Sequence, residues 1–390
     1  MKILLLNLWR VINSKGGTEK VFFNMANALT KLNYNVVAVG FDNNVGLPGF
    51  PVLDNVNFIN AGEGYTLKKP LFYRIKRTLN FSRNKRHLYD EKIFDPQIAV
   101  KLQPIIKKEN PDIIISFNAE ATRILIYNLK VMCPVITMFH YDPDTILSNV
   151  SSQTINALNQ CSCVQVLMPS FVEITKKYID NKIICIPNVV EQHAYVNRNS
   201  RQNIVINVGR VNKKQKRQAL LIEAFNKINY SDFEYQLEFY GETNVDSKYF
   251  KYCLQLIDKY KMNDKVKFAG STNNVFEKLN NASIFAFPSA YEGFGLALTE
   301  AMAAGLPAIG YKSCPAVNEL IIDGYNGFLC DDGIDDFADK LKILMSDAEL
   351  RKKMGQNARE SMKQFAPEKI WDQWEALINE VVAEHKNKQD

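Results

Sequence analysis

Short, strongly apolar segments alternate along this chain with segments whose apolar residues recur every three or four positions, and the alternation occurs in two sets. Apolar runs such as residues 2–6 are typical of parallel strands buried on both faces. The segment from residue 18 has helical spacing, with Val21, Met25, Ala28, Leu29 and Leu32 on one face. Strand, helix and strand in close succession predict βαβ units and a doubly wound parallel sheet. Further strands are expected at residues 35–39, 112–116, 135–139 and 163–167, and in the second set at 204–209, 235–240, 266–268 and 284–287.

The two sets predict an α/β fold with two Rossmann-like domains. Residues 190–203 are polar without an apolar period, which is typical of a linker. We therefore expect a first domain at 1–190, a linker at 191–203, a second domain at 204–368 and a C-terminal helix at 369–390. Ligands of open α/β sheets bind beyond the carboxyl ends of the strands, so two such domains are expected to face each other across a cleft.

Composition excludes several other classes of protein. The chain has 390 residues, with 48 Lys and Arg against 42 Asp and Glu, and a net charge of +6 is too small for a nucleic-acid coat. Its seven cysteines form no CxxC pair and its four histidines show no metal-ligand spacing, so reduced, packed thiols and no metal site are expected. The apolar start ends after six residues, and no segment approaches the ~18 to 20 apolar residues of a membrane span.

The most informative segment is residues 292–300, which begins with Glu292 and ends with Glu300. It follows a predicted strand, and two glycines stand where a helix is expected to begin. Such a turn leaves free N–H groups that suit phosphate or sugar oxygens. Eight residues are about two helical turns, so we expect the carboxylates roughly 12 Å apart, too far for a close acid/base pair. The alternative is an ordinary charged surface helix.

Basic residues follow the strand predicted at 204–209. Arg210 ends this strand and a basic run at 213–217 precedes the next helix. Cations fixed beyond a strand end suit a diphosphate, whose charge must be neutralised as it leaves. A solvated loop is the alternative.

Three further features lie near predicted strand ends in the first domain. Gly16 and Gly17 form a turn that would let a ligand approach the backbone, or a plain tight turn. His140 ends the strand at 135–139, where either a structural or a catalytic role is open. Asp142 and Asp144 form a DxD motif, but the Asp-Pro step also indicates the start of a helix, and we favour the latter.

Residues 68–87 hold eight cations and no acid, interleaved with apolar and aromatic side chains. This pattern suits either a solvated helix or an anionic membrane surface. The segment contains no known nucleic-acid-recognition motif, so no nucleic-acid partner is expected. The cations, with the histidine that closes the segment, are Lys68, Lys69, Arg74, Lys76, Arg77, Arg83, Lys85, Arg86 and His87.

Taken together, the sequence resembles bacterial glycosyltransferases of family 4, which have the GT-B fold. The string SAYEGFGLALTEAMAAGLPAI carries the E-x7-E signature. Supporting strings are VGRV followed by QKR before LLIEAF, the early GGTE, IPNVV at the expected domain crossover, and DGYNGFL.

The resemblance implies a role for each matching residue. Arg210 and Lys216 would bind the diphosphate, with Lys214 as the alternative lysine. Glu292 would bind the hydroxyls of the donor sugar and Glu300 those of the ribose. The amides of Phe294, Gly295 and Leu296 would lie near the donor. Gly16 and Gly17 would lie against the phosphates or the acceptor, and His140 against the transferred sugar.

The resemblance also implies an activity. The first domain would bind the acceptor, the second a nucleotide-sugar, and the C-terminal helix would return to the first domain. A retaining hexosyltransferase would move a hexose or N-acetylhexosamine from a UDP-sugar, without a metal cofactor, to a glycan or lipid-linked acceptor. We expect it in the cytoplasm, with contact to the inner face of the membrane left open. The alternatives are a non-catalytic nucleotide-sugar-binding partner subunit and a nucleotide-sugar epimerase.

Overall fold

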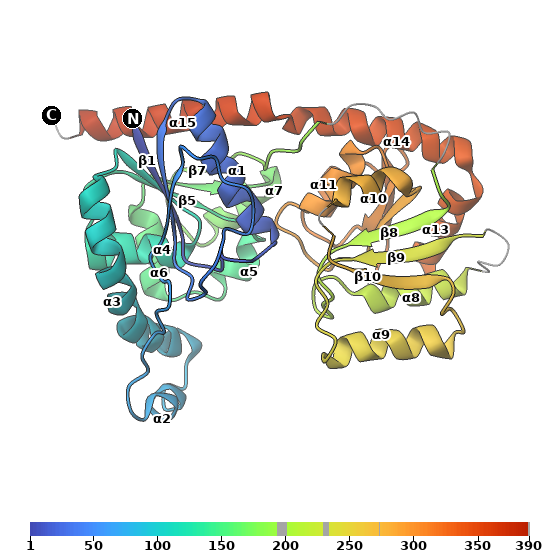
Figure 1. Ribbon diagram of the computed structural model, residues 1–390, viewed down its shortest axis with the longest axis horizontal. Coiled ribbons are helices and arrows are strands. Elements are labelled where there is room, and N and C mark those ends of the chain that lie inside the picture. The colour runs from blue at the N-terminus through green and yellow to red at the C-terminus, as the bar shows by residue number, and fades with distance from the viewer. Residues whose placement is uncertain (193–200, 229–233, 273, 389–390) are drawn as a thin grey trace. The chain divides into compact units, whose positions relative to one another are not determined.

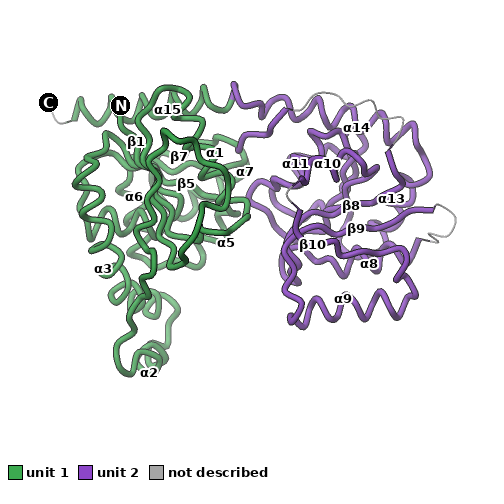
Figure 2. The backbone as a smooth tube through the Cα atoms, in the orientation of Figure 1, with its two compact units in different colours: residues 1–187, 370–390 green, residues 188–369 purple. Residues whose placement is uncertain are grey.

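The computed structural model describes residues 1–192, 201–228, 234–272 and 274–388. Its contacts divide the chain into two compact units (Figure 2). Unit 1 is Met1–Pro187 with Ile370–Asp390, and unit 2 is Asn188–Lys369. The central part of the expected linker, residues 193–200, lies outside the described residues.

Unit 1 is built on a parallel sheet of seven strands, in the order β3-β2-β1-β4-β5-β6-β7. In the register of the sheet, Leu4 lies between Val37 and Ile114, and all three are fully buried. The strand order changes direction between β1 and β4, which defines the switch point where such sheets bind ligands. The strands are β1 (Lys2–Asn7), β2 (Asn35–Gly40), β3 (Asn57–Asn60), β4 (Ile113–Ser116), β5 (Val135–Met138), β6 (Cys163–Val166) and β7 (Ile183–Cys185).

Helices cover this sheet, as Figure 1 shows. The first helix packs through Phe22, whose ring makes edge contacts with Phe23 and Phe117 at 5.1 and 5.0 Å. The apolar face predicted for this helix is therefore partly wrong, because Leu32 is 36 % exposed whereas Phe22 is fully buried. The helices are α1 (Gly17–Lys31), α2 (Tyr73–Thr78), α3 (Arg83–Glu109), α4 (Ala119–Arg123), a π-helical stretch (Ile124–Leu129), α5 (Pro143–Leu147), α6 (Ser152–Gln160) and α7 (Pro169–Lys176).

A buried ionic cluster joins α3 to α4. The Arg123 guanidinium donates to Asp95 at 2.7 Å and lies 3.0 Å from Glu91, and all three side chains are under 10 % exposed. Removing one partner of such a cluster leaves an uncompensated buried charge. The cluster therefore fixes the position of α4 and of the loop before it.

The last helix, α15 (Pro367–Asn387), packs on unit 1 from residue 370 onward. Its buried face consists of Ile370, Trp374, Leu377, Ile378 and Val381. At its polar edge Glu375 accepts a hydrogen bond from the Tyr34 hydroxyl at 2.8 Å, and Glu380 pairs with Lys182 at 2.7 Å. None of the described helices is long and apolar enough to cross a bilayer.

Unit 2 has a parallel sheet of six strands in the order β10-β9-β8-β11-β12-β13. Here too the order changes direction beside the first strand, between β8 and β11. The strands are β8 (Ile204–Val208), β9 (Gln236–Tyr240), β10 (Val266–Gly270), β11 (Ile284–Phe287), β12 (Ala308–Tyr311) and β13 (Gly327–Cys330). The helices are α8 (Gln218–Lys227), α9 (Lys248–Lys259), α10 (Val275–Asn281), α11 (Leu296–Ala303), α12 (Val317–Leu320), α13 (Asp335–Ser346) and α14 (Ala348–Met362), followed by a 3-10 turn (Lys363–Phe365).

None of the seven cysteines, all of which lie in the described part of the chain, forms a disulfide. Burial raises the pKa of Cys161 to about 11 and that of Cys163 to about 12, so these thiols are protonated at neutral pH. They pack as small apolar side chains, as the sequence predicts.

Candidate active site

In unit 2 the loop after β8 meets the loop after β11, the two strands that flank the switch point. The Ala290 amide donates to the Gln215 carbonyl at 2.8 Å, and the Gln215 side-chain amide donates to the Tyr291 carbonyl at 3.3 Å. These bonds hold the basic run beside the segment that carries Glu292.

At this junction Lys216 and Glu292 form an ion pair. Lys216 Nζ lies 2.6 Å from Glu292 Oε1, and the two side chains are 15 % and 8 % exposed. The ammonium also lies 4.6 Å from the centre of the Phe287 ring, a cation–π distance. The aliphatic part of Lys216 lies against Gly209, where an added Cβ would come within 3.2 Å of it. The structure thus holds the lysine in one place.

Three other basic residues of these loops differ sharply in their surroundings. The Arg217 guanidinium donates to the carbonyls of Pro288 and Ser289 at 2.7 and 2.8 Å and stacks on Tyr311. Arg217 is therefore a structural clamp on the loop after β11. Arg210 and Lys214 are exposed, and neither side chain has an ion pair or hydrogen bond with a described residue.

The segment from Glu292 to Glu300 is not one continuous helix. α11 begins only at Leu296, after Gly295 with φ +76°, so Glu292 lies in the preceding turn and Glu300 within the helix. The expected carboxylate separation of roughly 12 Å assumed that residues 292–300 are helical throughout. That assumption is wrong, because residues 292–295 precede the helix. The half-buried Glu300 projects from the helix, and the first amides of α11 have no partner within it.

Phe294 is anchored and buried. It is 2 % exposed, and its ring meets Phe365 edge-on at 5.3 Å. This contact positions the amides of Phe294, Gly295 and Leu296 at the start of α11, which is the part of the segment that can receive an anion or a hydroxyl oxygen.

Gly16, Gly17 and His140 belong to unit 1, whereas the other seven predicted site residues belong to unit 2. Gly16 is the N-cap of α1, and a Cβ on it would collide with the Glu19 carboxylate, which accepts a hydrogen bond from Ser14 at 2.9 Å. The Glu19 carboxylate therefore occupies the space beside position 16, and a side chain there would displace it.

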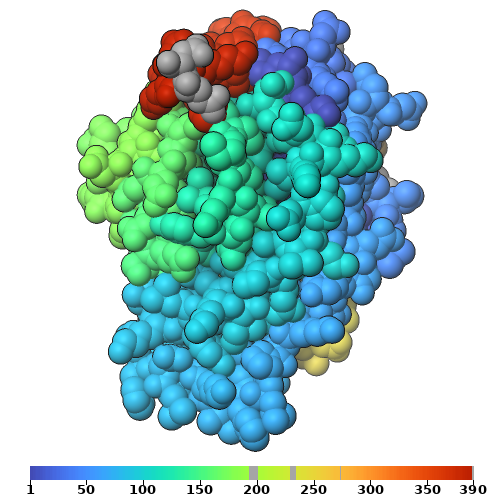
Figure 3. All heavy atoms as spheres, turned by 90° about the vertical axis from the view of Figure 1, so that its left-hand side faces the viewer, coloured from blue at the N-terminus to red at the C-terminus, as the bar shows by residue number. Residues whose placement is uncertain are grey.

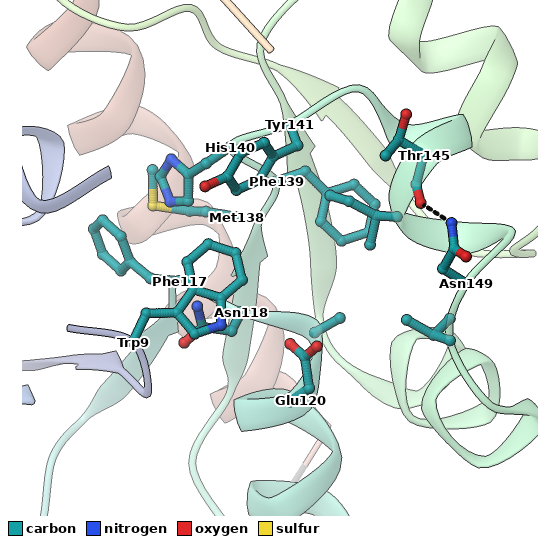
Figure 4. A pocket seen from close by; sticks show the side chains of 13 residues that line it. Trp9, Phe117, Asn118, Glu120, Met138, Phe139, His140, Tyr141, Thr145 and Asn149 are labelled. Atoms are coloured by element: carbon teal, nitrogen blue, oxygen red, sulfur yellow. Dashed lines mark hydrogen bonds between the residues drawn. The ribbon is translucent and has the colours of Figure 1, made fainter. Parts of the chain in front are cut away.

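His140 lines a cavity of about 320 Å³ at the carboxyl ends of β4 and β5 (Figure 4). Its ring stacks on Phe117, with centroids 4.9 Å apart. The residue is only partly buried as a whole, yet both ring nitrogens are buried and lack a hydrogen bond with any described residue. This burial lowers the pKa of His140 to about 3, so the imidazole is neutral at physiological pH.

The DxD motif has structural partners. Asp142 caps α5 by accepting hydrogen bonds from the Thr145 amide at 3.0 Å and its hydroxyl at 2.8 Å, and Asp144 accepts one from Tyr178. The helix-start interpretation is confirmed. Within the described part of the chain no group of three His, Cys, Asp or Glu side chains is placed to hold a metal.

Sequence reasoning missed Arg217 as a clamp and Trp9 and Asn118 as cavity residues. For Asn118 there was a usable signal, because it follows a predicted strand in the way that His140 does. No pattern in the sequence marks Trp9, whose position depends on the turn after β1.

Residues 189–361 match the family model described as Glycosyl transferases group 1. Over 358 residues the chain is 29 % identical to the N-acetyl-alpha-D-glucosaminyl L-malate synthase of Bacillus anthracis, covering 85 % of this chain and 91 % of that protein. It is 26 % identical to an uncharacterized glycosyltransferase of Haemophilus influenzae, covering 94 % and 97 %. It is 28 % identical to the poly(ribitol-phosphate) alpha-N-acetylglucosaminyltransferase of Staphylococcus aureus, covering 53 % and 42 %.

Solved structures share the fold. TarM of S. aureus, in complex with fondaparinux, alpha-GlcNAc-glycerol and UDP, aligns with a TM-score of 0.77 at 18 % identity, covering 97 % of this chain and all of that one. Anabaena HepE in complex with UDP aligns with a TM-score of 0.73 at 17 % identity, with the same coverage. The fold is GT-B, with two parallel-sheet α/β domains, as the sequence predicts. Bacterial glycosyltransferases are among the chain's relatives, several of them named for cell-surface polysaccharides, and together the comparisons support a glycosyltransferase.

Proposed function

We propose that this chain is a retaining glycosyltransferase of family 4 that transfers a hexose or N-acetylhexosamine from a UDP-sugar to a glycan or lipid-linked acceptor. The observation that carries the proposal is the contact between Lys216 and Glu292 at 2.6 Å beside the start of α11. It places a cation, a carboxylate and free backbone amides at the switch point of the sheet, where a diphosphate joined to a sugar needs them.

In this proposal unit 2 binds the donor. Lys216 and the exposed Arg210 neutralise the diphosphate as it leaves, and the amides at the start of α11 donate to oxygens of the donor. Glu292 accepts hydrogen bonds from hydroxyls of the transferred sugar, and Glu300 from those of the ribose. In the free protein Lys216 and Glu292 neutralise each other. When the donor binds, its diphosphate replaces Glu292 as the anionic partner of Lys216, and hydrogen bonds from the sugar hydroxyls replace the contact of Glu292 with Lys216, so neither side chain is left buried without a partner.

The proposed chemistry needs no covalent bond to the protein and no metal. The acceptor hydroxyl attacks the anomeric carbon on the face that the diphosphate leaves, and its proton passes to a phosphate oxygen. The neutral His140 does not take this proton, because its pKa lies at about 3. Its ring instead lies against the transferred sugar, and the small residues Gly16 and Gly17 allow phosphate or acceptor to approach α1.

UDP is the proposed nucleotide because it is present in the complexes of TarM and HepE. A lipid-linked acceptor is supported by a relative in Campylobacter jejuni named for an undecaprenol-linked substrate, which is 28 % identical over 171 residues. A cytoplasmic location at the inner face of the membrane is part of the same proposal.

The surface around α2 supports contact with an anionic membrane. Five large apolar side chains there are 59 to 87 % exposed, namely Leu71, Phe72, Ile75, Leu79 and Phe81. In the sequence they lie among the cations of residues 68–87. By its colour this segment forms the lower end of the face of unit 1 in Figure 3. Exposed apolar side chains combined with cations favour the headgroup region of a bilayer.

The test is a thermal-shift panel of UDP-, GDP-, ADP- and dTDP-sugars, with and without EDTA. A ligand at 100 times its dissociation constant adds ~2.7 kcal/mol of stability, which is a readily measured shift. A shift with a UDP-sugar that persists in EDTA supports the proposal. Loss of the shift in EDTA contradicts metal independence, and no shift with any donor contradicts the proposed function.

A further inference from the structure

The cavity in unit 1 lies at the switch point of its sheet. Trp9 comes from the turn after β1, Asn118 from the turn after β4 and Glu120 from the first turn of α4, and His140 and Tyr141 from the turn after β5 (Figure 4). Three neighbouring strands therefore deliver side chains to one cavity. Its volume of about 320 Å³ matches the lower end of small-molecule sites.

The cavity holds a polar group with a fixed orientation and no partner. The Leu8 amide donates to Asn118 Oδ1 at 2.7 Å, and a backbone N–H can bond only to the oxygen of the carboxamide. Asn118 Nδ2 therefore points elsewhere, and it is buried without a hydrogen bond. Both ring nitrogens of His140 are likewise buried and have no hydrogen bond with a described residue. Buried polar groups are almost always paired, so these atoms are candidates to bind oxygen atoms of a ligand.

Aromatic rings form much of the wall. Trp9 and Tyr141 meet edge-on with centroids 5.5 Å apart, and Phe117 stacks on His140. Flat aromatic surface beside a few polar groups suits a molecule with one apolar face and hydroxyls at its rim, which is the character of a sugar ring.

The charge of the cavity selects among such molecules. Among the thirteen described residues that line it, Glu120 is the one Asp, Glu, Lys or Arg, and burial lowers the pKa of His140 so that its imidazole is neutral. A carboxylate accepts hydrogen bonds from hydroxyls and repels other anions. No Lys or Arg is among these described residues, and the nearby Arg123, whose charge reaches Glu120, is already paired with Asp95 and Glu91.

We propose that this cavity binds an uncharged sugar ring of the acceptor, and that Glu120 excludes acceptors that carry an anion at this position. The inference rests on the proposed function and names the class of its acceptor. Asn118 Nδ2 donates to a ring or hydroxyl oxygen, Glu120 accepts from hydroxyls, and Trp9 covers the apolar face. The ring then lies beside His140, the residue assigned to the transferred sugar. This preference for an uncharged acceptor differs from what is expected of the B. anthracis relative, whose name includes the anion malate.

The experiment measures tryptophan fluorescence of the full chain titrated with methyl glucoside, methyl galactoside, methyl N-acetylglucosaminide, methyl glucuronide and L-malate. We expect a saturable signal from at least one neutral glycoside. Trp9→Phe should remove that signal, since Trp371 and Trp374 in α15 remain as an unchanged background. Methyl glucuronide, which differs from the glucoside only at its carboxylate, should bind roughly tenfold more weakly or worse.

Glu120→Gln keeps the shape of the side chain and removes its charge, so the glucoside and the glucuronide should then bind within about threefold of each other. Asn118→Asp, which keeps the oxygen for Leu8 and loses the donor, should weaken binding of the neutral glycoside. Equal binding of glucuronide or malate to the unaltered protein, or no saturation by any neutral glycoside, would overturn the inference. UDP-sugar binding in the same preparation separates the two proposals, because donor binding without glycoside binding overturns only this one.

Discussion

Lys216 and Glu292 lie 76 positions apart in the sequence, and their charged groups meet at 2.6 Å in the structure. Both were proposed separately as donor-binding residues, and their contact makes them one unit. A ligand that binds either of them must also satisfy the other, because an isolated charge at this depth is costly. The contact also distinguishes Lys216 from Lys214, whose side chain is exposed.

The first prediction concerns this lysine. Lys216→Ala should lower turnover at saturating donor ~100-fold or more, because one well-placed charged donor contributes ~2.7 to 4 kcal/mol to transition-state stabilisation. Lys214→Ala, two positions away, is the matched control and should retain most activity. Steady-state release of UDP measures both. Near-normal turnover of the Lys216 variant would refute the assignment.

The second prediction separates two neighbouring arginines. Arg217→Ala removes the hydrogen bonds to the Pro288 and Ser289 carbonyls and the stacking on Tyr311. We therefore expect the free energy of unfolding to fall by about 2 kcal/mol or more. Arg210→Ala should leave stability within about 0.5 kcal/mol, because its side chain is exposed, and should lower turnover instead. Urea denaturation and kinetics of both variants are the measurements. A loss of stability in Arg210→Ala, with a loss of turnover alone in Arg217→Ala, would contradict the roles proposed for the two arginines.

The third prediction concerns acid stability. The pKa of His140 lies at about 3 in the folded chain and near its ordinary value of 6.5 in the unfolded one. Between these two pH values the unfolded state binds a proton that the folded state does not, so stability falls as pH is lowered through the window, by at most ~1.4 kcal/mol per pH unit. His140→Phe, which cannot titrate, should lose less stability between pH 6.5 and 4.5. Parallel curves for the two proteins in urea denaturation would contradict this.

The fourth prediction concerns the surface around α2. Replacing Lys68, Lys69, Arg74 and Lys76 with Gln should weaken binding to vesicles rich in phosphatidylglycerol roughly 100-fold or more, since each cation near an anionic surface contributes about 1 kcal/mol. Arg77 is left in place because it pairs with Asp90 at 2.8 Å. Cosedimentation measures the binding.

The control for that experiment removes four exposed cations of unit 2, Lys248, Lys251, Lys261 and Lys267, by the same change to Gln. It should bind vesicles almost as the original protein does. Binding that persists in the first variant, or is lost equally in both, would contradict a specific role for residues 68–87.

Much of the fold could be predicted from the sequence because buried parallel strands are continuous apolar runs. Residues 2–6 and 284–287 illustrate this, and both are strands. The edge strand Asn57–Asn60 has only two apolar residues and carries no such signal. The helix Arg83–Glu109 contains Pro96 and Pro104, which argue locally against a helix, and it is held instead by packing and by Arg123.

For the candidate site, the sequence indicates residues but not their arrangement. The glycines and cations after strands β8 and β11 indicated a phosphate or sugar site, since strand ends are where such groups gather. The ion pair depends on hydrogen bonds between two loops, among them the one from the Ala290 amide to the Gln215 carbonyl. Contacts between loops produce no periodic pattern in the sequence from which they could be predicted. The same holds for the orientation of Asn118, which the Leu8 amide determines.

The most direct test of the central claim is a calorimetric titration of a UDP-sugar into the unaltered protein, Lys216→Ala and Lys214→Ala, all in EDTA. We predict saturable binding to the unaltered protein and to Lys214→Ala. Lys216→Ala should bind roughly tenfold or more weakly, because it loses a charge-assisted contact to the diphosphate. Equal binding to all three proteins, or no binding to the unaltered one, would contradict the account.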